Sequence, residues 1–140
     1  MRYKYFDHTA DAKFQAYGKT LEEAFGNAAV AMFNIMTDTK KIERKEKKHI
    51  KVKGTDLKAL LVNFLEEFIF MLDAENFLLQ DIEKVTIKKD KKEYSLEADA
   101  VGDFYKEKYI TQSDVKAATY NEMEIEEKKG KCMVQVVVDI

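Results

Sequence analysis

The stretch "VQVVVDI" (residues 134–140) ends the sequence with apolar side chains at almost every position. Valine is stiff at χ1 and favours extended backbone. Because neighbours of both parities are apolar, both faces of a strand here would be covered, which predicts a central position in a sheet. Asp139 stands near the end of the run, and a carboxylate there is costly unless it reaches the rim, a cation or hydrogen-bond donors.

Two other segments have the apolar periodicity of helices. Thr20 and Glu23 have capping-box spacing, which predicts a helix from there to Met36. A second apolar stripe predicts a helix from Asp56 to Leu72. The stripes consist of Leu21, Ala24, Phe25, Ala28, Ala29, Met32, Phe33 and Met36 in the first segment, and Leu57, Leu60, Leu61, Phe64, Leu65, Phe68 and Met71 in the second.

The remaining segments are typical of strands. Residues 10–17 alternate between apolar and polar and end at Gly18, and residues 49–53 form a short strand. Segments 84–89 and 93–102 flank a charged turn and predict one hairpin. Segments 115–126 and 132–140 predict another. The order β-α-β-α-β-β-β-β predicts an α+β fold, with two amphipathic helices packed on largely antiparallel sheet, in a single domain spanning residues 1–140.

Composition excludes several classes of function. The 140 residues carry 24 basic and 26 acidic side chains, and a net charge of −2 argues against a dedicated nucleic-acid binder. Cys132 is the only cysteine, so an intramolecular disulfide is excluded, and a buried thiol is expected. No apolar run is long enough to cross a membrane, and the first residues lack the apolar core of a signal peptide. We therefore expect a cytoplasmic protein.

The stretch "FDHTAD" (residues 6–11) places two acids and an imidazole close together. If a strand ran straight from residue 7, Asp7 and Asp11 would share its polar face, and His8 would share the face of Phe14. His8 would then be a partly buried, hydrogen-bonded histidine. The two acids are either solvated at the start of a strand or ligands of a metal ion.

The end of the sequence adds a second acidic group. The backbone carboxyl of Ile140 would lie beside the Asp139 side chain, and two adjacent anions repel unless a cation neutralises them. Oxygen ligands without clustered His or Cys favour calcium or magnesium over zinc. The alternative is a frayed, solvated terminus.

Lys116 lies within the mostly apolar stretch "VKAATY" (residues 115–120). It is either a charge that protects an edge strand, with its stem against apolar surface, or a cation that faces carboxylates or a phosphate. His49 lies in a charged strand, and no chemical role is expected for it. No nucleophile, base and orienting group occur together, which argues against an independent hydrolase.

Taken together, five stretches make the chain resemble the archease family. They are "DHTAD" (7–11), "YGKTLEEAFGNAAVAMFNIMTDT" (17–39), "DLKALLVNFLEEFIF" (56–70), "VKAATY" (115–120) and "VVVDI" (136–140). The resemblance implies an archease-like fold and an accessory protein of the RtcB-type RNA ligase, which joins tRNA halves during splicing. Such a protein promotes guanylylation of the ligase's active-site histidine, allows multiple turnover and broadens nucleotide use. It is not itself an enzyme.

The same resemblance implies a divalent-cation site, with calcium the first choice and magnesium the alternative. Its ligands would be Asp11, Asp139 and Ile140, with Lys116 as a functional residue nearby. Beside such a site we expect His8 to be local support rather than a ligand, while Asp7 is either support or a solvated acid. GTP and RNA would be met only through the ligase. The competing hypothesis is a chaperone-like binding module for RNA-modifying enzymes, such as a tRNA methyltransferase.

The sequence departs from the family pattern in two places. Asn121 stands after "VKAATY" where many members have His, and Tyr109 stands in the preceding loop where a His is frequent. These changes weaken any role for imidazole at that end, and they leave the three expected ligands in place.

Overall fold

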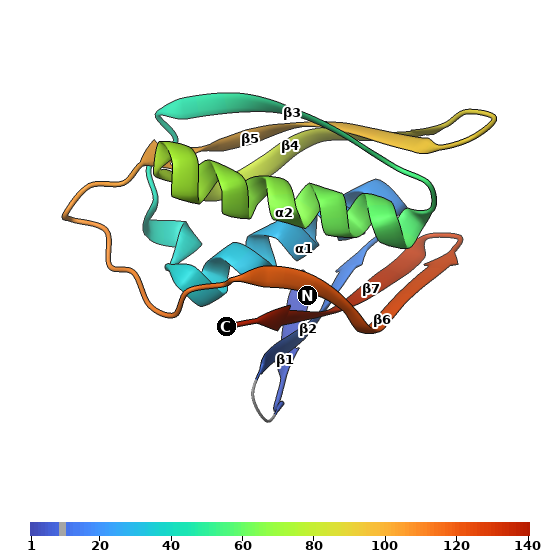
Figure 1. Ribbon diagram of the computed structural model, residues 1–140, viewed down its shortest axis with the longest axis horizontal. Coiled ribbons are helices and arrows are strands. Elements are labelled where there is room, and N and C mark those ends of the chain that lie inside the picture. Colours follow the sequence, from blue (N-terminus) through green and yellow to red (C-terminus); the bar gives the residue numbers. More distant parts are fainter. Residues whose placement is uncertain (9–10) are drawn as a thin grey trace.

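Two α-helices lie between two antiparallel β-sheets in the computed structural model, which describes residues 1–8 and 11–140 (Figure 1). One sheet has the strand order β1-β2-β7-β6, and the other has the order β3-β5-β4. In chain order the elements are β1 (Tyr3–Phe6), β2 (Asp11–Gly18), α1 (Leu21–Met36), the short 3₁₀ helix η1 (Thr39–Lys41), β3 (Glu46–Gly54), α2 (Leu57–Glu75), β4 (Phe77–Lys89), β5 (Tyr94–Phe104), β6 (Ala117–Lys128) and β7 (Lys131–Asp139). The predicted α+β class is confirmed.

Strand β7 lies between β2 and β6, as its two apolar faces predict. Val134, Val136 and Val138 point into the core, where they oppose Ala16, Phe14 and Ala12 of β2 in register. Val137 is also buried although it belongs to the other face. The valine run therefore belongs to the interior of the four-stranded sheet.

Helix α1 is buried around almost its whole circumference, because it contacts β2 and β7 on one side and β4 on the other. Ten consecutive residues from Ala24 to Phe33 are buried. Many of them are Ala or Gly, and such small side chains let the helix fit between two sheets. The Thr20 hydroxyl accepts a hydrogen bond from the Glu23 N–H at 3.1 Å, which is the N-cap that the sequence predicts.

Helix α2 buries one face against β3, β5 and β6, and Asp56 caps its start by accepting from the Ala59 N–H at 2.8 Å. It extends to Glu75, beyond the predicted end at Leu72, and Asn76 closes it in the left-handed conformation. Where the helix meets β6, Glu66 Oε1 accepts from the Ala118 N–H at 3.0 Å. That bond fastens the start of β6 to the helix.

Two strands differ from the sequence-based prediction by more than shifted ends, whereas the strands predicted at 49–53 and 115–126 are present as Glu46–Gly54 and Ala117–Lys128, so that Lys116 lies just before β6. Strand β1 was missed because four residues are too short to show a period, and it is held as an edge strand by pairing with β2. Strand β4 begins at Phe77 rather than Lys84. Irregularities in its pairing with β5, after Leu79 and after Glu83, interrupt the alternation that marks a strand. Both predicted hairpins, β4–β5 and β6–β7, are confirmed.

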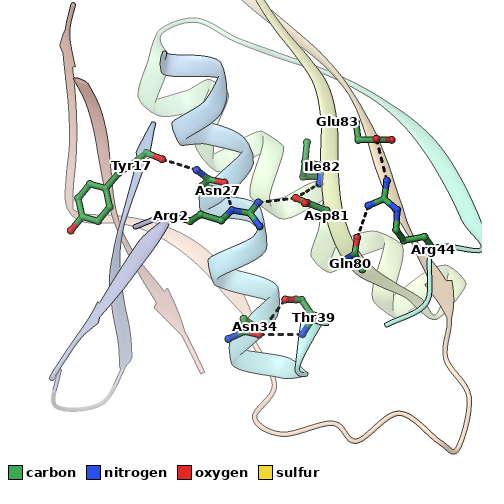
Figure 2. Close-up of polar contacts among 10 residues, drawn as sticks. All are labelled: Arg2, Tyr17, Asn27, Asn34, Thr39, Arg44, Gln80, Asp81, Ile82 and Glu83. Carbon is green, nitrogen blue, oxygen red and sulfur yellow. Dashed lines mark hydrogen bonds and ion pairs between the residues drawn. The ribbon is translucent and has the colours of Figure 1, made fainter. Parts of the chain in front are cut away.

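Polar side chains join the layers around α1 (Figure 2). Arg2 donates to the Asn27 side chain of α1 and to Asp81 of β4, at 2.8 and 2.7 Å. The Asn27 amide donates to the carbonyl of Tyr17 at 2.7 Å.

Cys132 is buried, as expected. Within the described residues, no helix is long and apolar enough to cross a membrane.

Candidate functional site

Asp11 and Asp139 lie directly opposite each other across the β2–β7 pair. Antiparallel partners point to the same face of a sheet, and here that face is turned away from α1, since Ala12 and Val138 point inward. Asp11 is the first residue of β2 and Asp139 the last of β7. The structure therefore brings the two predicted carboxylates together at one rim.

Lys116 and Ile140 belong to the same rim. The Lys116 N–H donates to the Asp139 carbonyl at 2.8 Å, just before β6 pairs Ala117 with Asp139. Figure 1 shows this end of β7 next to the start of β6. The Lys116 side chain is exposed, and Ile140 is 43% exposed. We define the site rim as Asp11, Lys116, Asp139 and Ile140.

The possible ligand atoms at the site rim are all oxygen atoms, which hard cations prefer. The Asp11 and Asp139 carboxylates face each other, and Ile140 adds backbone oxygen. Like charges directly opposite on adjacent strands destabilise a sheet, so a cation would relieve their repulsion. Across residues 1–8 and 11–140, no three His, Cys, Asp or Glu side chains are arranged to hold a metal ion. The metal site consequently stays a prediction that needs Ile140 as its third member.

His8 lies beside Asp11, but not on the core face where a straight strand would have put it. Strand β1 ends at Phe6 and β2 starts at Asp11, and Thr9 and Ala10 lie outside the described residues. His8 Nε2 is 2.8 Å from Glu122 Oε2, and Nδ1 is 3.6 Å from Asp11 Oδ2. The imidazole is therefore partly buried and hydrogen-bonded, at the outer face.

Asp7 is exposed, and the structure shows it no hydrogen bond or ion pair within the described part of the chain. Its expected supporting role is therefore neither favoured nor contradicted by a contact. Asp7 and Asp11 do not share a strand, because Asp7 lies between β1 and β2.

Glu122 is the residue of this region that sequence reasoning missed. It lies in β6 where pairing with β7 shifts between Thr119 and Glu124, and its φ of 52° is left-handed. Lys13 Nζ is 3.3 Å from Glu122 Oε1. Hydrogen bonding to His8 and then to Lys13 lowers the pKa of the Glu122 carboxyl. Nothing in "YNEMEIE" (120–126) distinguishes this glutamate from its neighbours, since the irregular pairing appears only in the folded sheet.

The two departures from the family pattern have different settings. Tyr109 is buried, and its hydroxyl donates to the buried Asp103 carboxylate at 2.6 Å. It thereby anchors the segment between β5 and β6. Asn121 is exposed beside Glu122.

His49, for which no chemical role was expected, is exposed and lies 3.0 Å from Asp99 and 3.1 Å from Glu97.

Comparison with known proteins gives consistent relatives. Residues 3–140 match the family model of the archease protein family (MTH1598/TM1083). The archease of Methanosarcina barkeri is 44% identical over 140 residues, covering 99% of this chain and 96% of the relative. The archease of Pyrococcus abyssi is 42% identical over 141 residues, covering 99% of each.

Solved structures agree with the observed fold. The solution structure of Methanobacterium thermoautotrophicum protein 1598 has a TM-score of 0.84 and 36% identity, covering 99% of each chain. A crystal structure of a Thermotoga maritima archease, named there a "possible chaperone", has a TM-score of 0.60 and 17% identity, covering 98% of this chain and 96% of that one. At that identity the likeness concerns the fold alone. With the family model matched over nearly the whole length and relatives above 40% identical, the chain belongs to the archease family.

Proposed function

We propose that this protein is an accessory activator of an RtcB-type tRNA-splicing RNA ligase. It promotes guanylylation of the ligase's active-site histidine, supports multiple turnover and broadens the ligase's use of nucleotides. It is not an enzyme by itself, and it meets GTP and RNA only through the ligase. The observation that carries the proposal is the convergence of Asp11 and Asp139 at one rim, in a chain that belongs to the archease family.

Asp11, Asp139 and Ile140 would hold a divalent cation, calcium first and magnesium second, because their donors are oxygen atoms. The cation would supply positive charge at the surface that meets the ligase. The chain's own contribution is to keep two carboxylates facing each other on paired strands. Because β7 is internal and β6 is fastened to Glu66, this end of the sheet is well supported.

Lys116 adds an ammonium group to the same rim. Its backbone is held by the bond to the Asp139 carbonyl, while its side chain is exposed. A triphosphate carries several negative charges, and an ammonium group near it offsets part of that charge. We propose that the site rim docks at the nucleotide pocket of the ligase and that Lys116 faces the phosphates.

Single-turnover guanylylation of the cognate ligase tests this function. Asp11→Ala and Asp139→Ala should each lose most of the stimulation, because each removes one of two facing carboxylates. Asp73→Ala, which removes an exposed carboxylate from α2, is the matched control and should stimulate like the wild type. Stimulation at the wild-type level by both Asp11→Ala and Asp139→Ala would contradict the proposal.

The role of the cation is tested by multiple turnover of the ligase, with and without this protein, in calcium, in magnesium and with a chelator. The ligase's own metal requirement is controlled by running each condition without the accessory protein. We expect the increment due to this protein to fall in chelator and to return with calcium. An increment that is equal in all three conditions contradicts a metal-dependent rim.

A chaperone-like binding module for RNA-modifying enzymes, such as a tRNA methyltransferase, is the second candidate. The observation in its favour is a set of exposed apolar side chains, among them Phe70 at 60%, Ile110 at 73% and Tyr120 at 58%. This function predicts stimulation of the partner that survives Asp11→Ala and Asp139→Ala but is lost in Phe70→Ser. The ligase assay with these three variants separates the two candidates.

A further inference from the structure

Glu122 is held in an unusual backbone conformation at the irregular point of β6. Its φ of 52° lies in the left-handed region of backbone conformation, which residues other than glycine seldom adopt. Three extra residues of β6 fall between the pairs Thr119–Val137 and Glu124–Gln135. Strained positions of this kind persist only where surrounding contacts determine them, and they concentrate at functional sites.

Contacts hold Glu122 at its backbone carbonyl and at its side-chain carboxylate. The Gln135 side-chain amide donates to the Glu122 carbonyl at 2.7 Å, and Gln135 in turn accepts from Gln15 at 2.8 Å. The carboxylate lies 2.8 Å from His8 Nε2 and 3.3 Å from Lys13 Nζ. Backbone and side chain are thus tied to β7, β2 and the segment before β2.

The contact with His8 fixes the orientation of the imidazole. With Nε2 bonded to Glu122, the ring directs Nδ1 toward Asp11 Oδ2, 3.6 Å away. Nδ1 is inaccessible to solvent and has no hydrogen-bond partner within the described part of the chain. A buried polar atom without a partner is uncommon and calls for a reason. Among residues 1–8 and 11–140, the acidic group that Nδ1 approaches is the Asp11 carboxylate.

We propose that Glu122 is a positioning residue that acts through His8 to hold the Asp11 carboxylate in the orientation required for cation binding. Groups behind a metal ligand commonly orient it in this way, and their loss typically costs about 10- to 100-fold in metal affinity. The inference rests on the proposed cation site at the rim. It adds one residue from β6 and a chain of two contacts to a site otherwise built from the ends of β2 and β7.

A simple surface ion pair does not account for these features. An exposed glutamate can meet a lysine from an ordinary strand conformation, without a left-handed backbone and without an imidazole between it and a second carboxylate. A purely local role in the β6 bulge also differs in its consequences. It predicts that replacing Glu122 changes stability but not cation affinity.

The experiment is calcium titration by calorimetry on the full chain. Glu122→Ala and His8→Ala should each weaken calcium binding about tenfold. If the two residues act as one unit, the double variant should be no weaker than the weaker single variant. Glu126→Ala, an exposed glutamate further along β6, makes the same charge change and should have a smaller effect. Glu122→Gln keeps an acceptor for His8 and should recover part of the affinity.

A second readout does not depend on calcium. In metal-free protein at one fixed pH, the ¹⁵N shifts of the His8 ring should change in Glu122→Ala and stay near those of the wild type in Glu126→Ala. Far-ultraviolet circular dichroism and the thermal midpoint check that each variant is folded. If Glu122→Ala does not fold, Glu122→Gly, which removes the carboxylate and suits the left-handed backbone, takes its place in the same cycle.

The outcomes separate this inference from the function on which it rests. Calcium binding that is weakened by Asp11→Asn but unchanged by Glu122→Ala overturns the positioning role alone. Effects of Glu122→Ala and His8→Ala that multiply in the double variant also overturn it, because they indicate only through-space charge. Calcium binding that is absent from the wild type, or unaffected by Asp11→Asn, overturns the cation site itself.

Discussion

At the scale of single residues, His49 is a pH-sensitive contact on the outer face of the three-stranded sheet. Hydrogen bonds to Asp99 and then Glu97 raise its pKa above the ordinary value of 6.5. Because the folded-state pKa is raised, these contacts stabilise the folded protein fully below pH 6.5, and the stabilisation is lost as pH rises through the raised pKa. The protonated imidazole is the form that both acids favour.

We therefore predict that His49→Gln flattens the pH dependence of stability across the neutral range. Wild type should lose stability as pH rises above 6.5 and through the raised pKa of His49, whereas the variant should lose less. Thermal unfolding midpoints measure the slope, and ring-proton titration by NMR measures the raised pKa. Lys51→Gln, which changes another exposed side chain of the same strand to Gln, is the control. Equal slopes in wild type and His49→Gln contradict the prediction.

At the scale of elements, the segment between β5 and β6 is held to the rest of the fold by Tyr109. Its hydroxyl bonds to the buried Asp103, which Lys106 also approaches at 3.1 Å. Further along, the Gln112 N–H donates to the Met36 carbonyl at the end of α1. The segment leads directly to Lys116, so its anchors help to place one member of the site rim.

Tyr109→Phe should destabilise the protein by about 1–3 kcal/mol, because it leaves a buried carboxylate short of one donor. The bond from Tyr109, followed by those from Lys106 and the Phe104 N–H, lowers the Asp103 pKa. Stability from Asp103 is therefore present above its ordinary pKa of 3.8 and lost as pH falls. The difference in the free energy of unfolding between wild type and Tyr109→Phe should therefore narrow at acid pH. Urea unfolding at two pH values measures it, and Tyr105→Phe, at an exposed site, should change little.

At the scale of the whole molecule, Arg2 connects the edge of one sheet to the helix layer and to the other sheet (Figure 2). Its guanidinium bonds to Asn27 of α1 and Asp81 of β4. Asn27 is buried, at 6% exposure, whereas the ion pair with Asp81 is partly exposed. The bond to Asn27 and the ion pair with Asp81 should therefore contribute differently to the free energy of unfolding.

Arg2→Leu should destabilise the fold by about 1–3 kcal/mol, because the Asn27 side-chain oxygen loses its donor while buried. Asp81→Asn should cost at most about 1 kcal/mol, since an exposed ion pair contributes little. Chemical denaturation of both variants provides the comparison. Equal losses would show that the ion pair, and not the buried amide, makes this connection.

Most of the secondary structure could be predicted from the sequence, and part of the site could. The helix that begins after Thr20 and the helix that begins after Asp56 were both predicted, because periodicity and capping act over a few residues. Strand β1 and the first half of β4 were missed, since a four-residue edge strand and irregular pairing leave no clear period. For Asp11 and Asp139 the residue types and positions were visible, but their placement face to face was not.

The pair of helices, the interior position of "VQVVVDI" and the family follow from patterns within short stretches of residues, and for that reason they can be predicted before the fold is known. The contacts between distant side chains depend instead on the folded structure. Glu122 reaches His8 across 114 positions of sequence, and Asp11 faces Asp139 because β2 and β7 pair in one particular register. Strand register and the irregularity in β6 depend on packing of the whole sheet against α1 and α2, and no short stretch of residues carries that information.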